Sequence, residues 1–161
     1  MNPSKPLEQK KVAEKIKLRR RLRAVIDTNL FISGLFGKDT VSARIQNHWI
    51  NLDFILVTSI DIIKEVNRVF HCPRIQQRFN PKEETLKKFF RLIFRKAIIT
   101  KDRYKTDRIT DDPTDNKFLA CALEGKADYV VSRDPHLRNL KHYYGIQIVD
   151  ANTFVSKIAD E

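Results

Sequence analysis

The chain contains little cysteine, little glycine and no long hydrophobic run, and each scarcity excludes a class of protein. Two cysteines in 161 residues allow at most one disulfide, and Cys121 lies in an apolar helical pattern typical of a buried, reduced thiol. The four glycines form no phosphate-binding loop. No apolar stretch reaches bilayer length, and no apolar segment follows the basic N-terminus, so we expect neither a membrane span nor a secretory signal. These features predict a cytoplasmic globular protein.

Positive charge is concentrated at the N-terminus. The net charge is +11, and residues 1–23 contain nine Lys or Arg against two Glu. We therefore predict a basic arm over residues 1–22, either helical or disordered, and one domain over residues 23–161, because this length suffices for one core. The arm, with Arg19, Arg20 and Arg21, suits a polyanion, since each neutralised phosphate releases counterions. A solvated tail explains the same charges equally well.

Apolar runs of strand length alternate with segments of helical periodicity. The predicted strands are residues 24–26, 53–59, 97–100, 128–132 and 146–150. The predicted helices cover residues 40–52, 59–71, 80–96, 112–125 and 150–159, with a short one at Asp134, and their N-caps include Ser59, Asn80, Asp112 and Asp150. This alternation predicts a parallel sheet with helices on both faces, in which ligands gather at the carboxyl ends of the strands.

Four acidic residues fall near that edge of the predicted sheet. Asp27 ends the first strand in "RAVIDTN", and Asp134 follows the strand "DYVVS". Asp115 shares the apolar face of its helix, and Glu65 lies just beside the apolar arc of residues 59–71 when each residue turns the helix by about 100°. Carboxylates that converge on one cleft repel each other unless a hard cation lies among them. The set therefore indicates a Mg²⁺ or Mn²⁺ site.

Each acid also has a purely structural interpretation. Asp27 could form an Asx turn or cap the next segment, and Asp134 suits a helix N-cap. Asp115 could complete a capping box with Asp112, and Glu65 could be a solvated helix residue. Taken singly, these interpretations are the commoner ones, but taken jointly the four acids favour a metal site. No Cys/His set has zinc spacing and no serine lies in a nucleophile elbow, so the sequence predicts neither a zinc site nor a serine hydrolase.

The motifs "VIDTN", "DDPTDNKFLACAL" and "ADYVVSRDPHL", with Glu65 between the first two, resemble those of PIN-domain proteins in their order. The resemblance runs from about Arg23 to Ser156. More narrowly, the chain is similar to the VapC-like ribonucleases, the toxins of bacterial toxin–antitoxin systems. The resemblance implies a three-layer α/β/α sandwich with a central, mainly parallel sheet. It also implies Mg²⁺- or Mn²⁺-dependent cleavage of RNA, a homodimer and a cognate antitoxin protein.

Transferred by position, the resemblance assigns the catalytic and metal-binding quartet. Its members are Asp27, Glu65, Asp115 and Asp134. The same transfer makes Asn29 and Ser132 polar supports of the quartet, and Asp112 or Asp111 an auxiliary acid.

The fourth motif departs from the family pattern, which often has glycine before the acid and a further aspartate after it. Here Arg133 precedes Asp134, and Pro135 and His136 follow it. Arg133 could contact a substrate phosphate, and it could also weaken cation binding by repulsion.

Two alternatives to a toxin ribonuclease stay open at the level of sequence. One is a non-catalytic nucleic-acid-binding or regulatory module on the same fold, and the other is a housekeeping RNA-processing nuclease. The presence of all four acids favours an enzyme. The aromatic-rich segment 83–96 is either a buried helix or a surface for a second copy or an antitoxin, since obligate interfaces are apolar.

Overall fold

The centre of the fold is a six-stranded sheet. The computed structural model describes residues 7–9, 20–37 and 40–161. Its strands are β1 (Arg23–Ile26), β2 (Ile55–Ser59), β3 (Ile98–Thr100), β4 (Tyr129–Val131), β5 (His142–Tyr143) and β6 (Ile146–Val149). They lie in the order β3-β2-β1-β4-β6-β5, and every pairing is parallel except that of β5 with β6. The predicted mainly parallel sheet is confirmed.

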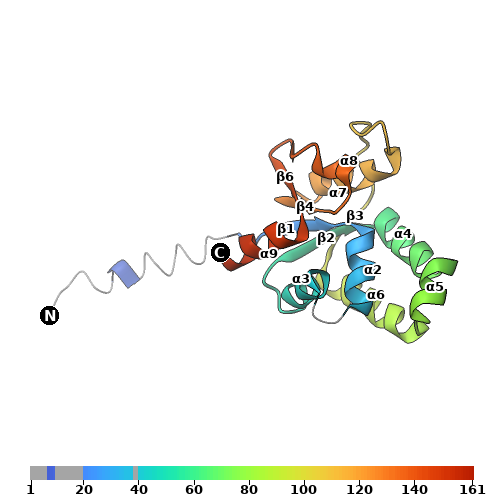
Figure 1. Cartoon of the computed structure of the whole chain (residues 1–161). Helices are drawn as coiled ribbons and strands as arrows, with labels where there is room; N and C mark the ends of the chain where they lie inside the picture. Colours follow the sequence, from blue (N-terminus) through green and yellow to red (C-terminus); the bar gives the residue numbers. More distant parts are fainter. Residues whose placement is uncertain (1–6, 10–19, 38–39) are drawn as a thin grey trace.

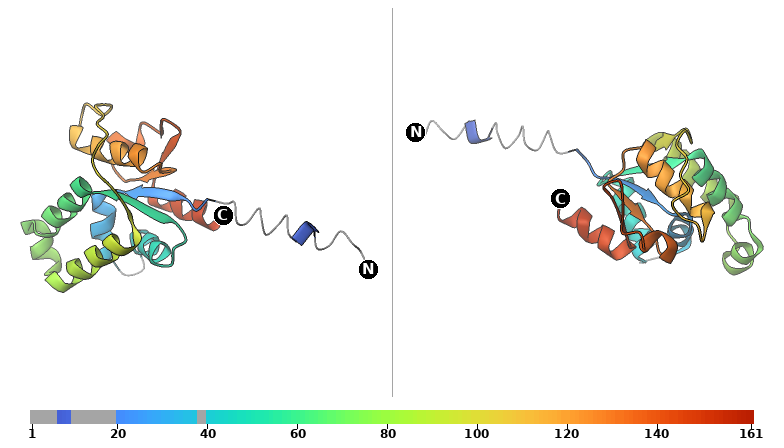
Figure 2. Two further views of the ribbon diagram at one scale, coloured as in Figure 1. Left: turned by 180° about the vertical axis from the view of Figure 1, so that it is seen from behind. Right: turned by 90° about the horizontal axis from the view of Figure 1, so that it is seen from above.

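Helices cover both faces of this sheet, which confirms the three-layer α/β/α architecture (Figure 1). One face carries α7 (Asn116–Glu124) and the short α8 (Pro135–Arg138). The other side carries α2 (Thr28–Phe36), α3 (Val41–Ile50), α4 (Ile60–Phe70), α5 (Pro73–Phe79), α6 (Glu83–Lys96) and α9 (Ala151–Ala159). Figure 2 shows the same division from behind. No helix in the described part of the chain is long and apolar enough to cross a membrane.

The strand order changes direction at β1. From β1 the chain runs outward through β2 to β3, and it then returns to place β4 on the other side of β1. The three residues Ala24, Val25 and Ile26 of β1 are at most 2% exposed, so this strand is fixed in the core. In such sheets, ligands bind beyond the carboxyl ends of the strands at the point where the order reverses. The ends of β1 and β4 are therefore the expected place for a site.

Side-chain caps begin several of the helices next to that place. The hydroxyl of Ser59 accepts a hydrogen bond from the Ile62 amide at 3.2 Å, and Asp150 accepts one from the Thr153 amide at 2.8 Å. Both residues are confirmed as the N-caps predicted from the sequence, of α4 and α9.

The predicted N-cap at Asn80 is wrong. Asn80 adopts a left-handed conformation, with φ 42° and ψ 55°, and ends the unpredicted helix α5; its amide donates to the Gln76 carbonyl. Asparagine tolerates this conformation better than most residues, so it suits a helix end as well as a helix start. Helix α6 begins only at Glu83, without a side-chain cap.

Four further features differ from the prediction. Helix α2 was not predicted, because its buried residues Leu30, Phe31 and Ile32 are consecutive and give no helical period. Helix α3 ends at Ile50, before Leu52, which has a left-handed φ of 62°. Asp112 caps a 3₁₀ turn, η1 (Pro113–Asp115), and α7 follows this turn. The two-residue strand β5 is too short to leave a period in the sequence.

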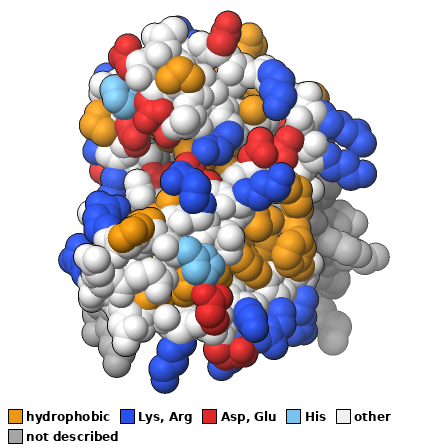
Figure 3. Space-filling view, turned by 90° about the vertical axis from the view of Figure 1, so that its right-hand side faces the viewer, with side chains coloured by type: hydrophobic (Ala, Val, Ile, Leu, Met, Phe, Trp, Pro, Cys, Tyr) orange, Lys and Arg blue, Asp and Glu red, His pale blue; other side chains and the backbone are white. Residues whose placement is uncertain are grey.

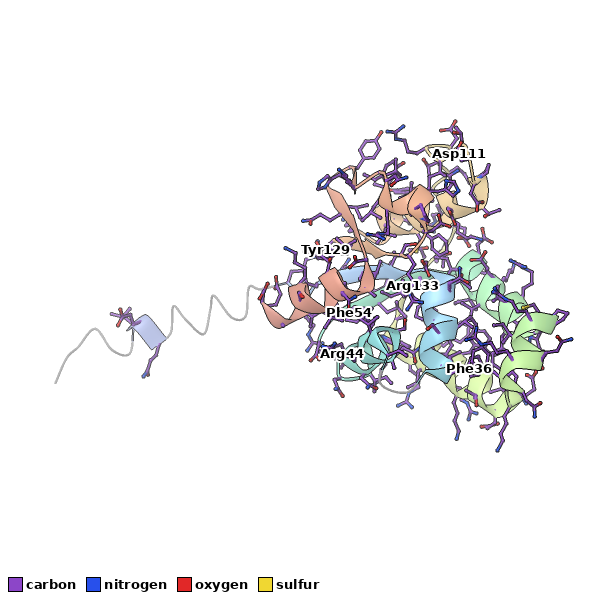
Figure 4. All side chains as sticks on the ribbon, viewed as in Figure 1. Phe36, Arg44, Phe54, Asp111, Tyr129 and Arg133 are labelled. Carbon is purple, nitrogen blue, oxygen red and sulfur yellow. The ribbon has the colours of Figure 1, made fainter. Side chains whose placement is uncertain are left out.

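Phe154 on α9 tests the packing of the core. It is fully buried, with ring centroids 5.0 Å from Phe54 and 5.6 Å from Tyr129, both labelled in Figure 4. We expect Phe154→Ala to lower the free energy of unfolding by about 3–5 kcal/mol in urea titrations, because it leaves a cavity. Tyr144→Ala truncates an aromatic side chain that is 82% exposed, and it should have an effect below about 1 kcal/mol. Equal losses would contradict this core.

Candidate active site

Three aspartates form a cluster at the carboxyl end of the sheet. Asp112, Asp115 and Asp134 each place one carboxylate oxygen within 4.8 Å of the other two. They open onto a cleft of about 220 Å³ that Asp27 and Glu65 also line. The structure thus brings the four predicted acids and the predicted auxiliary Asp112 to one cleft. Asp27 and Glu65 contribute to its wall and lie outside the cluster of three.

Hydrogen bonds hold both carboxylate oxygens of Asp27. Its Oδ1 accepts from the Leu30 amide at 2.9 Å and caps α2, and its Oδ2 accepts from the Arg133 amide at 3.2 Å. Burial raises the pKa of the Asp27 carboxyl above its usual value, and hydrogen bonds from Ser132, Leu30 and Arg133 oppose that rise. The capping interpretation of Asp27 is therefore correct, and the same side chain still faces the cleft.

Ser132, one of the two predicted supports, connects two of the acids. It is fully buried, hydrogen-bonds to the Asp27 carboxylate, and accepts a hydrogen bond from the Asp134 amide at 2.9 Å. Asp134 in turn caps α8 by accepting from the His136 amide at 2.8 Å. The other predicted support, Asn29, lines the cleft and is exposed. The end of β4 thus fixes the relative positions of Asp27 and Asp134.

Asp115 differs from these acids because its side chain caps no helix. It is 8% exposed, and its Oδ2 atom is buried without a hydrogen-bond partner among the described residues. Burial, followed by the negative charges of Asp134 and Asp112, raises the pKa of Asp115 to about 7. A buried, unpartnered carboxylate oxygen is costly unless a cation binds it. The cluster, which offers only hard oxygen donors, therefore fits Mg²⁺ or Mn²⁺.

Asp112 stays anionic beside Asp115. The Thr114 hydroxyl donates to its Oδ1 at 2.5 Å and the Thr114 amide donates at 3.2 Å, which lowers the pKa of Asp112. The neighbouring Asp111 is exposed at the tip of the same segment (Figure 4), 3.8 Å from the His136 ring. Two neighbouring carboxyl groups, Asp112 and Asp115, thus have pKa values moved in opposite directions.

The structural interpretation of Glu65 as a solvated helix residue is wrong, because its side chain is only 17% exposed. Its Oε1 lies 2.8 Å from the Lys117 ammonium and 3.6 Å from the Arg68 guanidinium, and its Oε2 accepts a hydrogen bond from the Thr28 hydroxyl. The sequence reasoning assigned no role to Thr28 or Lys117. Their positions in the sequence could have indicated such a role, because Thr28 follows Asp27 directly and Lys117 comes two residues after Asp115.

The sequence predicted nucleic-acid contacts at Arg19, Arg20, Arg21 and Arg133. Of these arginines, the three that the structure describes do not line the cleft. Most of the predicted arm, including Arg19, lies outside the described residues. Arg20 pairs with Asp128 at 3.3 Å beside the starts of β1 and β4. The Arg133 guanidinium donates to Ser42 on α3 at 3.0 Å (Figure 4). The binding roles of these arginines stay predictions.

The comparison with known families agrees with this geometry. The family model described as the PIN domain matches residues 23–136. The chain belongs to the PIN-domain family. An uncharacterized protein of Methanocaldococcus jannaschii is 28% identical over 128 residues, which is 80% of this chain and 78% of that protein. PIN domains are generally nucleases, so the acidic cluster lies in a fold that carries out hydrolysis of nucleic acids.

The raised pKa of Asp115 makes the stability of the metal-free protein depend on pH. The carboxyl titrates near 3.8 in the unfolded chain and at about 7 in the folded one, so between these values only the folded state holds the proton. The free energy of unfolding therefore falls as pH rises through this window. Asp115→Asn should flatten the profile and, in EDTA near pH 7.5, raise the free energy of unfolding, because it removes the ionisation that burial disfavours. Urea titrations across the window measure both, and an unchanged slope would contradict the assignment.

Proposed function

We propose that this PIN-domain protein is a Mg²⁺- or Mn²⁺-dependent endoribonuclease that hydrolyses phosphodiester bonds in single-stranded or looped RNA. The observation that supports this function best is the buried, unpartnered Oδ2 atom of Asp115 beside the carboxylates of Asp112 and Asp134. Such a set of oxygen donors suits a hard divalent cation. Residues 23–161 would form the nuclease domain and residues 1–22 a basic arm.

Each acidic residue has a proposed role in the cleft. Asp115, Asp134 and Asp112 would hold the cation, with Asp27 beside them. A bound divalent cation lowers the pKa of water and stabilises charge on the leaving oxygen. Asp27 is already fixed by amide donors to both of its oxygens, so it needs little reorganisation when substrate binds. Glu65, the other member of the predicted quartet, also lines the cleft, and its ion-pair partner Lys117 would supply a positive charge beside a bound substrate.

Cleavage of a generic single-stranded RNA tests this function. We expect cleavage with Mn²⁺ or Mg²⁺, and a loss of at least about 100-fold with EDTA or in Asp115→Asn and Asp27→Asn, because each change removes a proposed contact with the cation. Asp160→Asn, the same change at an exposed position, should cleave normally. Mn²⁺ should also raise the melting temperature of the unsubstituted chain and not that of Asp115→Asn.

Two results would contradict the proposal. Cleavage that survives Asp27→Asn and Asp115→Asn would place the activity elsewhere. RNA binding without cleavage under any metal would favour the non-catalytic module on the same fold.

The proposed cellular role is that of a toxin in a toxin–antitoxin pair, acting in the cytoplasm as a homodimer held in check by a cognate antitoxin. Helix α6 buries Leu86, Phe89 and Ile93 on one face. Phe90 and Phe94, four residues apart, leave an apolar strip on its outer side, where Phe94 is 61% exposed. Apolar strips of this kind are used by obligate interfaces, so a second copy or the antitoxin would cover it. Both cysteines are free, as the reducing cytoplasm requires.

Growth on expression separates a toxin from a housekeeping nuclease. We expect expression of the unsubstituted chain to arrest bacterial growth, because uncontrolled cleavage of RNA stops translation. Asp115→Asn, made to the same level, should permit growth, and so should co-expression of a small gene found next to this one. Normal growth with an active, well-expressed chain would favour the housekeeping role.

A further inference from the structure

A second hollow adjoins the acidic cleft. It is a groove of about 490 Å³ between α4, α7 and the segment 102–106. The groove and the cleft share Glu65, Arg68 and Thr114 as lining residues. The two hollows are therefore adjacent, so a polymer that extends out of the cleft on this side meets the groove next.

Basic side chains line this groove from three segments. Lys64 and Arg68 lie four residues apart on one face of α4, so both point to the same side of that helix. Lys117 comes from α7, and Lys105 comes from the segment after β3. Figure 3 shows the right-hand side of Figure 1, where α4 lies, and Lys and Arg side chains lie beside acidic ones across the middle of that surface.

Three of the four carboxylates that line the groove, those of Glu65, Asp102 and Glu124, are occupied by other groups, whereas Asp61 is exposed and takes part in no ion pair within the described ranges. Glu124 accepts hydrogen bonds from the amides of Lys101 and Arg103, both at 3.1 Å. Asp102 accepts one from the Asp61 amide at 3.3 Å. These two acids therefore hold the segment after β3 in place. The backbone N–H dipoles that they accept partly compensate their negative charge, so they repel a phosphate less strongly.

The cations of the groove are freer than its acids. Lys64 and Lys105 are exposed and take part in no ion pair within the described ranges. The Arg68 side chain is 72% exposed and reaches Glu65 only at 3.6 Å. Three ammonium or guanidinium groups thus remain available to phosphates along a path that leads away from the acidic cluster.

An aromatic ring lies on the same path. Tyr104 lines the groove and is 51% exposed, which leaves part of its ring accessible to solvent. An exposed aromatic ring next to cations is the combination with which proteins bind single strands, since an unpaired base stacks on the ring while its backbone contacts the charges. A base held in a duplex is already stacked on both faces and cannot use it.

We propose that this groove binds the single-stranded RNA next to the phosphate to be cut. Lys64, Arg68 and Lys105 contact consecutive backbone phosphates, and Tyr104 stacks on one unpaired base. The inference rests on the proposed ribonuclease function and adds the path of the substrate, the residues that hold it and a preference for unpaired RNA.

The test is a binding measurement with full-length Asp27→Asn protein and a fluorescent oligouridylate of about ten nucleotides. Fluorescence anisotropy monitors the binding, and EDTA prevents cleavage. Lys64→Gln with Lys105→Gln should weaken binding about tenfold or more, and should reduce the slope of log K against log salt by about 1.4, since each lost phosphate contact on a single strand removes about 0.7. Tyr104→Ala should weaken binding at least about fivefold without changing that slope.

The chain offers matched controls. Lys88→Gln with Lys157→Gln removes two exposed lysines of α6 and α9 that do not line the groove. Tyr144→Ala removes an 82% exposed tyrosine from the β5–β6 hairpin. Both should bind RNA as the parent protein does. Circular dichroism and melting temperature establish that every variant is folded.

The outcomes separate this inference from the function on which it rests. If the groove variants bind like the controls while the unsubstituted chain cleaves RNA, the groove is not the path and the ribonuclease proposal stands. If duplex RNA or single-stranded DNA of equal length binds as tightly as the oligouridylate, the proposed occupant is wrong. If the chain neither binds nor cleaves RNA, both proposals fail.

Discussion

Repulsion among carboxylates at the end of a buried sheet is the constraint that the rest of this structure accommodates. The chain reduces it by giving most of the acids a second, structural task. Asp27 caps α2 and also accepts a hydrogen bond from the amide of Arg133, just after β4. Asp134 caps α8, and Asp112 caps the turn before α7. Glu65 is neutralised by Lys117. Among these five acids, only Asp115 keeps a buried carboxylate oxygen without a hydrogen-bond partner, and burial beside Asp134 and Asp112 raises its pKa. The uncompensated charge is thereby concentrated at one residue.

Structural and functional interpretations of an acidic residue are therefore not exclusive in this protein. A capping hydrogen bond occupies one carboxylate oxygen and fixes the orientation of the other. In Asp27 both oxygens are fixed in this way, and Ser132 links that carboxylate to the amide of Asp134. A set of ligands positioned before a cation arrives loses less conformational freedom on binding it. The caps that stabilise the helices also preorganise the cleft.

The sequence predicted the parallel sheet because each strand is a short apolar run between helical segments. It did not predict α2, since a helix packed on several sides shows no amphipathic period, and it misplaced the N-cap at Asn80 because asparagine serves both ends of a helix. The four acids were recognised because strand ends and helix faces can be read from spacing. The contacts of Glu65 with Thr28 and Lys117 could not be predicted from spacing, because they depend on how α4 packs against α2 and α7. The roles of the acids in catalysis stay predictions.

The order of the strands has a consequence for how the protein is made. Asp27 and Glu65 belong to the first half of the chain, whereas Asp112, Asp115 and Asp134 belong to the last third, and β4 pairs with β1 across that interval. As the chain emerges from the ribosome, β1, β2 and β3 can assemble first, with only two of the five acids and without the Arg133 amide that fixes Asp27. The cleft is complete only when β4 has inserted beside β1. For a protein proposed to cut RNA, vectorial synthesis thus delays activity until β4 has been made and has paired with β1.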